Sequence, residues 1–339
     1  MSASYSYSSS YTHEEIPAGT KIGEFEVIQM IGEGGYGQIY EVVKDIENKH
    51  YAMKIEYLSA RKKGLQLEVR VLKDCQISSQ FPLFVDSGRT STFRFFVMEL
   101  LGPSLSQLCR SLSTRTFSKY TYLHLSIHMV RCIQSLHRLG YIHRDVKPGN
   151  FLIRPYRKHP LCFIDFGLAR KYITETGEVK PPRKNPGYTG TMRYASLTAH
   201  DEKELSRRDD LISWFYSMIE LSAGALPWPG SENKEKTIKM KRTMEIEDLC
   251  KSLTPEFVDI YKMITALKYE DEPDYDGIVN LIKKSIVNQS FIVHKYDWEL
   301  MNRHEIIQIS TIPLDMHDLA SSDPALNKNE HEGGCCIIS

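Results

Sequence analysis

The stretch that decides the fold of this chain is residues 143–150, which read His-Arg-Asp-Val-Lys-Pro-Gly-Asn. It follows a run over residues 120–140 in which apolar residues recur at helical spacing and a glycine ends the pattern. In such a loop Asp145 can orient a hydroxyl and accept its proton, Lys147 can neutralise a phosphoryl group, and Asn150 can ligate a metal ion. The stretch therefore predicts phosphoryl-transfer chemistry.

A second acidic motif, Asp165-Phe166-Gly167, follows the apolar run at residues 161–164. A carboxylate at the end of a buried strand is well placed to hold Mg²⁺ against phosphates. Either short motif alone is common by chance, but the two in this order, with a glycine cluster and a strand lysine upstream, make coincidence improbable.

A glycine cluster, Gly32-Glu33-Gly34-Gly35-Tyr36-Gly37, lies between two strand patterns. Gly32, Gly34 and Gly37 allow the backbone to approach phosphate oxygens and present N–H groups to them. A tight hairpin alone would explain the cluster about as well. A dinucleotide-binding fold is rejected, because a strand follows where that fold needs a helix.

A lysine inside a strand, Lys54 of Tyr51-Ala52-Met53-Lys54, should need a charged partner. The helical pattern at residues 64–75 supplies Glu68, which faces inward with Leu65 and Leu72. Such a pair would hold the ammonium toward the nucleotide phosphates. The alternative is a surface lysine and a solvated glutamate.

Together the four motifs resemble a eukaryotic protein kinase over about residues 25–300. Residues 98–105 (Met-Glu-Leu-Leu-Gly-Pro-Ser-Leu) and 190–196 (Gly-Thr-Met-Arg-Tyr-Ala-Ser) resemble the casein kinase I superfamily, which lacks the Ala-Pro-Glu triplet of most kinases. Residues 180–183, 273–275 and 297–299 look closest to the tau-tubulin kinase branch of that superfamily.

The resemblance implies an α+β, two-lobed protein-kinase fold, with a small β-rich N-lobe containing one helix and a larger helical C-lobe. We expect a disordered arm at residues 1–23, a kinase domain at 24–300 and a flexible tail at 301–339. Within the domain, the N-lobe is expected at 24–98, the hinge at 99–103 and the C-lobe at 104–300.

The resemblance also implies a site for ATP and Mg²⁺, with the metal held by Asn150 and Asp165. Glu99 to Leu101 would be the hinge that bonds the base, and Met98 the gatekeeper. The adenine would lie between six apolar side chains, those of Ile31, Ile39, Ala52, Met98, Leu152 and Ile164. For Ile39 and Ile164, plain apolar core is an equal alternative without the family.

Three further residues take roles by the same resemblance. Thr191 would bridge Asp145 and Lys147, a combination typical of kinases directed at Ser and Thr. Asp210 would brace the catalytic loop, although an acid at a helix N-terminus is also favoured by the helix dipole. His143 is expected to anchor the loop rather than carry a proton.

Arg193, near Lys180, Arg183 and Lys184 in the sequence, is a candidate anion site for an acidic or already phosphorylated substrate. The alternative is a solvated basic loop. The chain has all six polar residues that catalysis by this family needs: Lys54, Glu68, Asp145, Lys147, Asn150 and Asp165. Their presence favours an active serine/threonine protein kinase acting on proteins. The competing hypothesis is a pseudokinase that serves as a membrane-tethered interaction module.

Composition excludes several other classes. The 339 residues carry 43 Lys+Arg against 43 Asp+Glu, so there is no positive surplus for nucleic-acid binding. Seven scattered cysteines fit a reducing, cytoplasmic compartment better than a disulfide framework. We expect a monomer.

The last four residues, Cys336-Ile337-Ile338-Ser339, fit a C-terminal prenylation signal, with Cys335 as a candidate palmitoylation site. One prenyl chain gives marginal affinity, so we expect partial, reversible membrane association. A chance apolar end is the alternative.

Overall fold

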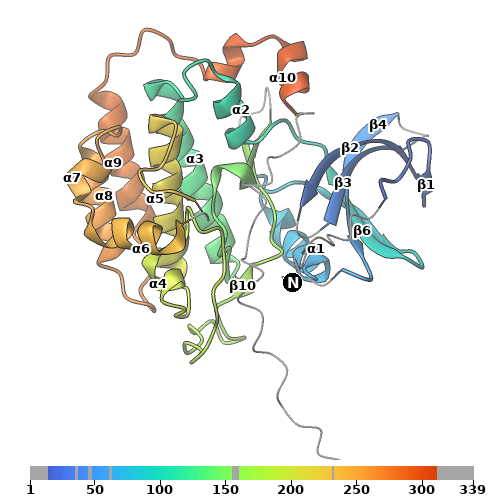
Figure 1. Cartoon of the computed structure of the whole chain (residues 1–339), viewed down its shortest axis with the longest axis horizontal. Coiled ribbons are helices and arrows are strands. Elements are labelled where there is room, and N and C mark those ends of the chain that lie inside the picture. Colours follow the sequence, from blue (N-terminus) through green and yellow to red (C-terminus); the bar gives the residue numbers. More distant parts are fainter. Residues whose placement is uncertain are drawn as a thin grey trace, which may run out of the picture.

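A computed structural model describes residues 14–34, 37–44, 48–60, 63–154, 160–230 and 233–310 of the chain. Figure 1 shows two lobes, one built mainly of strands and one mainly of helices. The expected α+β kinase fold, with a β-rich N-lobe and a helical C-lobe, is confirmed.

The N-lobe is a six-stranded antiparallel sheet in the order β1-β2-β3-β4-β6-β5. Its strands are β1 (Lys21–Ile22), β2 (Phe25–Gly34), β3 (Gly37–Lys44), β4 (Lys49–Tyr57), β5 (Phe84–Arg89) and β6 (Phe93–Glu99). Successive side chains of a strand point to opposite faces. On β3, Tyr40 and Val42 therefore enter the core of the sheet, while Ile39 and Glu41 face the cleft between the lobes.

One helix of this lobe, α1 (Leu65–Asp74), packs against the sheet. Leu65, Glu68, Val71 and Leu72 are buried, at the three- and four-residue spacing of a single helix face. The amphipathic pattern thus places a carboxylate among apolar contacts, where it needs a positively charged partner.

The C-lobe is built around α3 and α5, which pack on each other and on neighbouring helices. Its helices are α2 (Leu105–Ser111), α3 (Lys119–Arg138), α4 (Leu197–His200), α5 (Arg207–Ala223), α6 (Lys234–Thr243), α7 (Ile246–Leu249), α8 (Glu256–Thr265), α9 (Tyr275–Val287) and α10 (Arg303–Ser310). Most of α5 is buried, Trp214 and Phe215 completely. Among the described residues no helix is long and apolar enough to span a bilayer.

Four short strands position the functional loops at the base of the cleft. They are β7 (Tyr141–Ile142), β8 (Phe151–Ile153), β9 (Leu161–Phe163) and β10 (Arg170–Lys171), paired β7 with β10 and β8 with β9. Residues 143–150 connect β7 to β8, and Asp165 comes two residues after β9. A backbone hydrogen bond of 3.0 Å from Ile164 N to Asn150 O joins the two loops.

Two expected boundaries need correction. The arm expected at residues 1–23 overlaps ordered structure, because β1 pairs with β2 and Ile16 N donates to Tyr40 Oη at 2.9 Å. The tail expected at 301–339 also overlaps it, because α10 packs on α2. Buried isoleucines on α10, Ile306 and Ile309, supply the apolar face that drives this packing. Cys335 and Cys336, the predicted lipidation sites, lie outside the described residues.

Candidate active site

The lysine of β4 meets two carboxylates that come from distant parts of the chain. Lys54 Nζ lies 2.7 Å from Glu68 Oε2 on α1 and 3.0 Å from Asp165 Oδ1 after β9. The predicted Lys54–Glu68 pair is therefore present, and Asp165 is a second partner from the C-lobe. This contact fixes the N-lobe strand and helix relative to the loop that follows β9.

The charges of this cluster set the protonation of its members. Burial alone would lower the pKa of Lys54, but Asp165 and Glu68 outweigh it and raise the pKa above its ordinary value. Burial also opposes ionisation of Asp165, yet Lys54 and Lys147 lower the pKa of its carboxyl to about 2. Burial of Glu68, only partly offset by Lys54, raises the pKa of Glu68 to about 7.

The catalytic loop brings Asp145, Lys147 and Thr191 into direct contact. Asp145 Oδ1 accepts hydrogen bonds of 2.7 Å from both the backbone N–H and the hydroxyl of Thr191. Lys147 Nζ lies 2.9 Å from Asp145 Oδ2 and donates to Thr191 Oγ1 at 3.1 Å. The bridge expected at Thr191 is thus observed, across 46 residues of sequence.

Gly190 makes this approach possible. Its φ is +106°, and a Cβ atom there would lie 2.6 Å from the backbone oxygen of Arg144. Glycine alone combines that conformation with so close a contact to the catalytic loop.

A buried carboxylate, Asp210 of α5, holds the backbone of the catalytic loop. Asp210 accepts hydrogen bonds from His143 N at 2.7 Å and Arg144 N at 2.8 Å, and it lies 2.8 Å from His137 Nε2. Arg144 has a φ of +69°, a conformation that non-glycine residues rarely adopt. The contacts of Asp210 hold the loop in this strained form, as the expected brace requires.

His143 occupies a structural position. Its ring is buried and stacks on Phe163 with centroids 4.2 Å apart, and Nε2 lies 3.0 Å from the backbone oxygen of Ile164. Its Nδ1 accepts a hydrogen bond of 3.2 Å from Asp145 N. These contacts use both ring nitrogens, which fits an anchor rather than a proton carrier.

The residues expected to hold a metal ion fit a divalent cation. Asp165 is ionised, and Asn150 is held in the loop by a 2.8 Å hydrogen bond from its amide nitrogen to Asp145 O, which leaves the amide oxygen as a ligand. Hard divalent cations prefer such oxygen ligands. Among the described residues no cluster of three or more His, Cys, Asp or Glu side chains would hold a metal. In a phosphoryl-transfer site, oxygens of the nucleotide phosphates would complete the shell.

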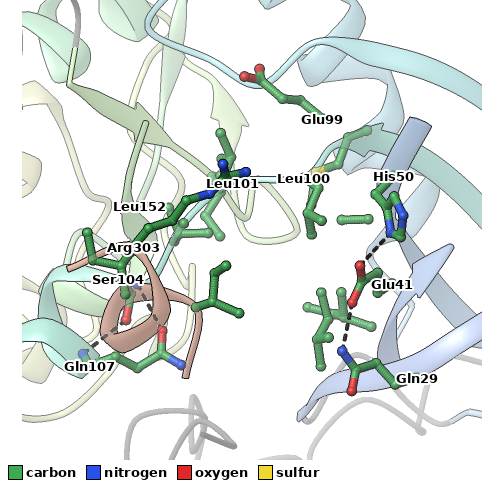
Figure 2. A pocket seen from close by; sticks show the side chains of 18 residues that line it. Gln29, Glu41, His50, Glu99, Leu100, Leu101, Ser104, Gln107, Leu152 and Arg303 are labelled. Atoms are coloured by element: carbon green, nitrogen blue, oxygen red, sulfur yellow. Dashed lines mark hydrogen bonds and ion pairs between the residues drawn. The ribbon is translucent and has the colours of Figure 1, made fainter. Parts of the chain in front are cut away.

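A cavity of about 810 Å³ between the lobes contains the expected adenine site. Its walls include every apolar residue assigned to the adenine: Ile31, Ile39, Ala52, Met98, Leu152 and Ile164. Glu99 and Leu101 line the hinge side. In Figure 2 side chains from the strands and from the C-lobe face each other across it. Its size is that of a small-molecule site.

Three glycines of the cluster lie at the paired ends of β2 and β3, beside Ile31 and Ile39 of the cavity wall. Gly32 pairs with Ile39, and Gly34 pairs with Gly37. Gly37 has a φ of +131°, and a Cβ atom there would lie 1.8 Å from the backbone oxygen of Ile55, so only glycine fits.

Two structural contacts were missed from the sequence. Arg154, after β8, donates to both carboxylate oxygens of Glu99 at 2.7 and 2.6 Å and so fixes the hinge. Lys241 of α6 is buried and donates to the backbone oxygens of Met192 at 2.8 Å and Ala195 at 2.7 Å. Neither residue belongs to a short motif, so no local signal marked it.

The candidate anion residue, Arg193, is paired rather than free. Arg193 Nη2 lies 2.8 Å from Glu220 Oε1, while Arg183 pairs with Glu204 at 2.5 Å. Arg193 Nε is buried without a hydrogen-bond partner among the described residues. Its guanidinium is therefore only partly satisfied by Glu220.

Comparisons with known proteins agree with this geometry. The family model described as "Protein kinase domain" matches residues 25–290. A probable serine/threonine-protein kinase of Dictyostelium discoideum is 39% identical over 281 residues, which cover 82% of this chain but 57% of that relative. The serine/threonine-protein kinase spe-6 of Caenorhabditis elegans is 33% identical over 286 residues, 81% of this chain and 76% of that protein. The chain therefore belongs to the protein kinase family, whose members are ATP- and metal-dependent phosphotransferases.

Proposed function

We propose that this chain is an active serine/threonine protein kinase that transfers the γ-phosphoryl group of Mg·ATP to hydroxyls of protein substrates. The observation that carries the proposal is the contact of Asp145 with both Lys147 and Thr191, beside the Lys54–Glu68–Asp165 cluster. A scaffold without activity could replace these buried charges with apolar residues, because the desolvation of a buried ion pair can cost more than the pair gains.

The side chains have distinct tasks in this reaction. Asp145 orients the substrate hydroxyl and accepts its proton, and Thr191 and Lys147 hold Asp145 in place. Lys147 also neutralises charge on the transferring group, while Lys54 binds the nucleotide phosphates. Asp165 and Asn150 would hold Mg²⁺, which supplies further charge neutralisation when bound.

The test is incorporation of labelled phosphate into a generic acidic protein by the full chain. The matched variant is Asp145→Asn, which keeps the size of the side chain but removes the carboxylate that accepts the proton. We expect the variant to lose at least a hundredfold in rate. Equal incorporation by the two proteins would contradict the proposal and favour the pseudokinase alternative.

Within the family, we propose a place in the casein kinase I superfamily near the tau-tubulin kinase branch. Support comes from residues 190–196 and from Ser196, where most kinases have proline. Ser196 caps α4 by accepting a hydrogen bond from Ala199 N and donates to Asp209 at 2.7 Å, contacts that a proline cannot make.

For substrates, we propose a preference for acidic or already phosphorylated sequences, with Arg193 as the anion-binding residue. The partial exposure of Arg193 supports this, because a third of its side-chain surface is accessible and a charged phosphate could compete with Glu220 for the guanidinium. Primed and unprimed forms of one peptide provide the test. Arg193→Ala should raise the KM of the primed peptide selectively, and an equal change for both peptides would exclude the pocket.

We also propose that Cys336 carries a prenyl group, with Cys335 as a second lipid site, and that the kinase is cytoplasmic and partly membrane-associated. Cys336-Ile337-Ile338-Ser339 has the form of a signal that is read only at a C-terminus. Intact-mass measurement of protein from its native cell tests this. A prenyl group without the last three residues is expected, and an unmodified mass would contradict it.

A further inference from the structure

A helix beyond the matched kinase domain forms part of the nucleotide cavity. The family match ends at residue 290, whereas α10 begins at Arg303. Ile306 and Ile309 are buried, and Gln107 Nε2 donates to the backbone oxygen of Ile309 at 3.4 Å. Figure 1 shows α10 beside α2, at the side of the C-lobe that faces the strands. The helix is thus docked on α2, beside the cavity between the lobes.

Three residues of α10 line the same cavity as the adenine-site residues: Arg303, Ile306 and Ile307. Ile306 contributes to the core beneath the cavity, whereas Ile307 keeps 52% of its surface exposed. A large apolar side chain exposed inside a binding cavity gains free energy when a ligand covers it. Of the three α10 residues in the cavity wall, Ile307 would therefore bury the most apolar surface against a bound ligand.

The opposite wall of this part of the cavity is polar. Gln29 and His50 both contact Glu41 on β3, at 2.7 and 2.6 Å from its two carboxylate oxygens. Figure 2 shows these three residues on one side and Arg303 on the other, with the cavity between them. The cavity thus continues past the hinge, between a strand surface and α10.

With α10 docked the cavity still holds about 810 Å³, so the helix is a wall and not a plug. We propose that α10 is a third wall of the nucleotide site and that Ile307 packs against the bound nucleotide. The proposal deepens the proposed kinase function and rests on it for the identity of the ligand. Because binding free energies are reciprocal, a nucleotide that contacts α10 also stabilises the docked helix.

The test measures binding of ADP to the full chain by titration calorimetry. Ile307→Ala should weaken ADP binding by about fivefold, which corresponds to about 1 kcal/mol. The matched control is Gln308→Ala, on the same helix but outside the cavity lining, and it should bind ADP like the wild type. If Ile307→Ala also binds like the wild type, the proposal is wrong.

A second measurement follows the helix itself. Hydrogen exchange of residues 303–310 should slow when ADP is added, and unchanged exchange at saturating ADP would contradict the coupling. Ile309→Asp, which undocks α10, should also weaken ADP binding; tighter binding would mean that the helix obstructs the site and would overturn the proposal. Both readouts are independent of phosphoryl transfer. A chain that binds ADP in this way but transfers no phosphate would refute the kinase function alone.

Discussion

The hydroxyl of Thr191 offers a sharp test of how the catalytic carboxylate is held. It donates to Asp145 Oδ1 at 2.7 Å and accepts from Lys147 Nζ at 3.1 Å. Thr191→Val keeps the volume and shape of the side chain but removes both hydrogen bonds. Because each involves a charged group, the lost positioning costs about 1.5–3 kcal/mol, or roughly ten- to a hundredfold in kcat.

The fold should survive this change. Asp145 Oδ1 keeps the hydrogen bond from the Thr191 backbone N–H, and Lys147 keeps its ion pair with Asp145 Oδ2 at 2.9 Å. We therefore expect the free energy of unfolding to fall by only about 1–2 kcal/mol. Urea denaturation measures that quantity alongside the kinetics.

Thr191→Ser is the matched control, because it restores the hydroxyl without the methyl group. Steady-state phosphorylation of a peptide by the three proteins should place the serine variant within about threefold of the wild type. The reasoning fails if the valine variant keeps a near-normal kcat. It fails equally if serine and valine impair the enzyme to the same extent, since the hydroxyl would then have no special part.

Three further predictions concern buried charges. Asp210→Asn should lower the free energy of unfolding by about 2–4 kcal/mol in urea denaturation, because the NH₂ that replaces one carboxylate oxygen is a donor and cannot accept the backbone N–H that this oxygen held. Burial opposes ionisation of Asp210, but its contacts with His137 and His143 outweigh burial and lower its pKa below the ordinary aspartate value. The stabilisation is therefore present above the ordinary pKa and is lost as pH falls through the lowered one. A variant as stable as the wild type at pH 7 would contradict this role. Glu68 has a pKa of about 7, so kcat/KM should fall as pH drops from 8 to 6, because protonated Glu68 no longer balances the charge of Lys54. The variant Glu68→Gln should be less active at pH 8 and should lack this pH dependence. A variant whose pH profile matches that of the wild type would exclude the assignment. Lys241→Met keeps the aliphatic stem of the side chain but leaves two buried backbone carbonyls without their hydrogen bonds. The free energy of unfolding, measured by thermal denaturation, should therefore fall by about 2–4 kcal/mol. An unchanged melting temperature would show that Lys241 does not stabilise this backbone.

Much of the site was predictable because its motifs are local. Asp145, Lys147 and Asn150 lie within one loop, so their spacing alone indicated their roles. The helical pattern around Glu68 indicated which face of α1 is buried. The contact between Lys54 and Asp165 spans 111 residues, and only the order of the motifs suggested that they serve one site.

Residues outside the motifs escaped prediction. Arg154, which holds the hinge through Glu99, lies in a stretch that reads as an ordinary strand end. Lys241 sits in a lysine-rich helix and has the pattern of a solvated residue, yet its amino group is buried against the 192–195 backbone. A lysine is placed inside only by the packing of several elements, which single-sequence periodicity does not encode.

From the sequence alone, strand alternation, helix periodicity and loop motifs determined the secondary-structure pattern and the catalytic loop, because these signals act over a few residues. The resemblance of the motifs to protein kinases implied the two-lobed fold and the walls of the adenine site. Only the tertiary structure showed that Asp165 joins the Lys54–Glu68 pair, that Lys241 is buried, and that ordered structure continues to residue 310. The stretch expected as a tail at 301–339 instead begins with α10. The apolar face of this helix is short and becomes buried only because it packs on α2. Burial of that face depends on surfaces supplied by residues some two hundred positions away, such as Gln107 against Ile309.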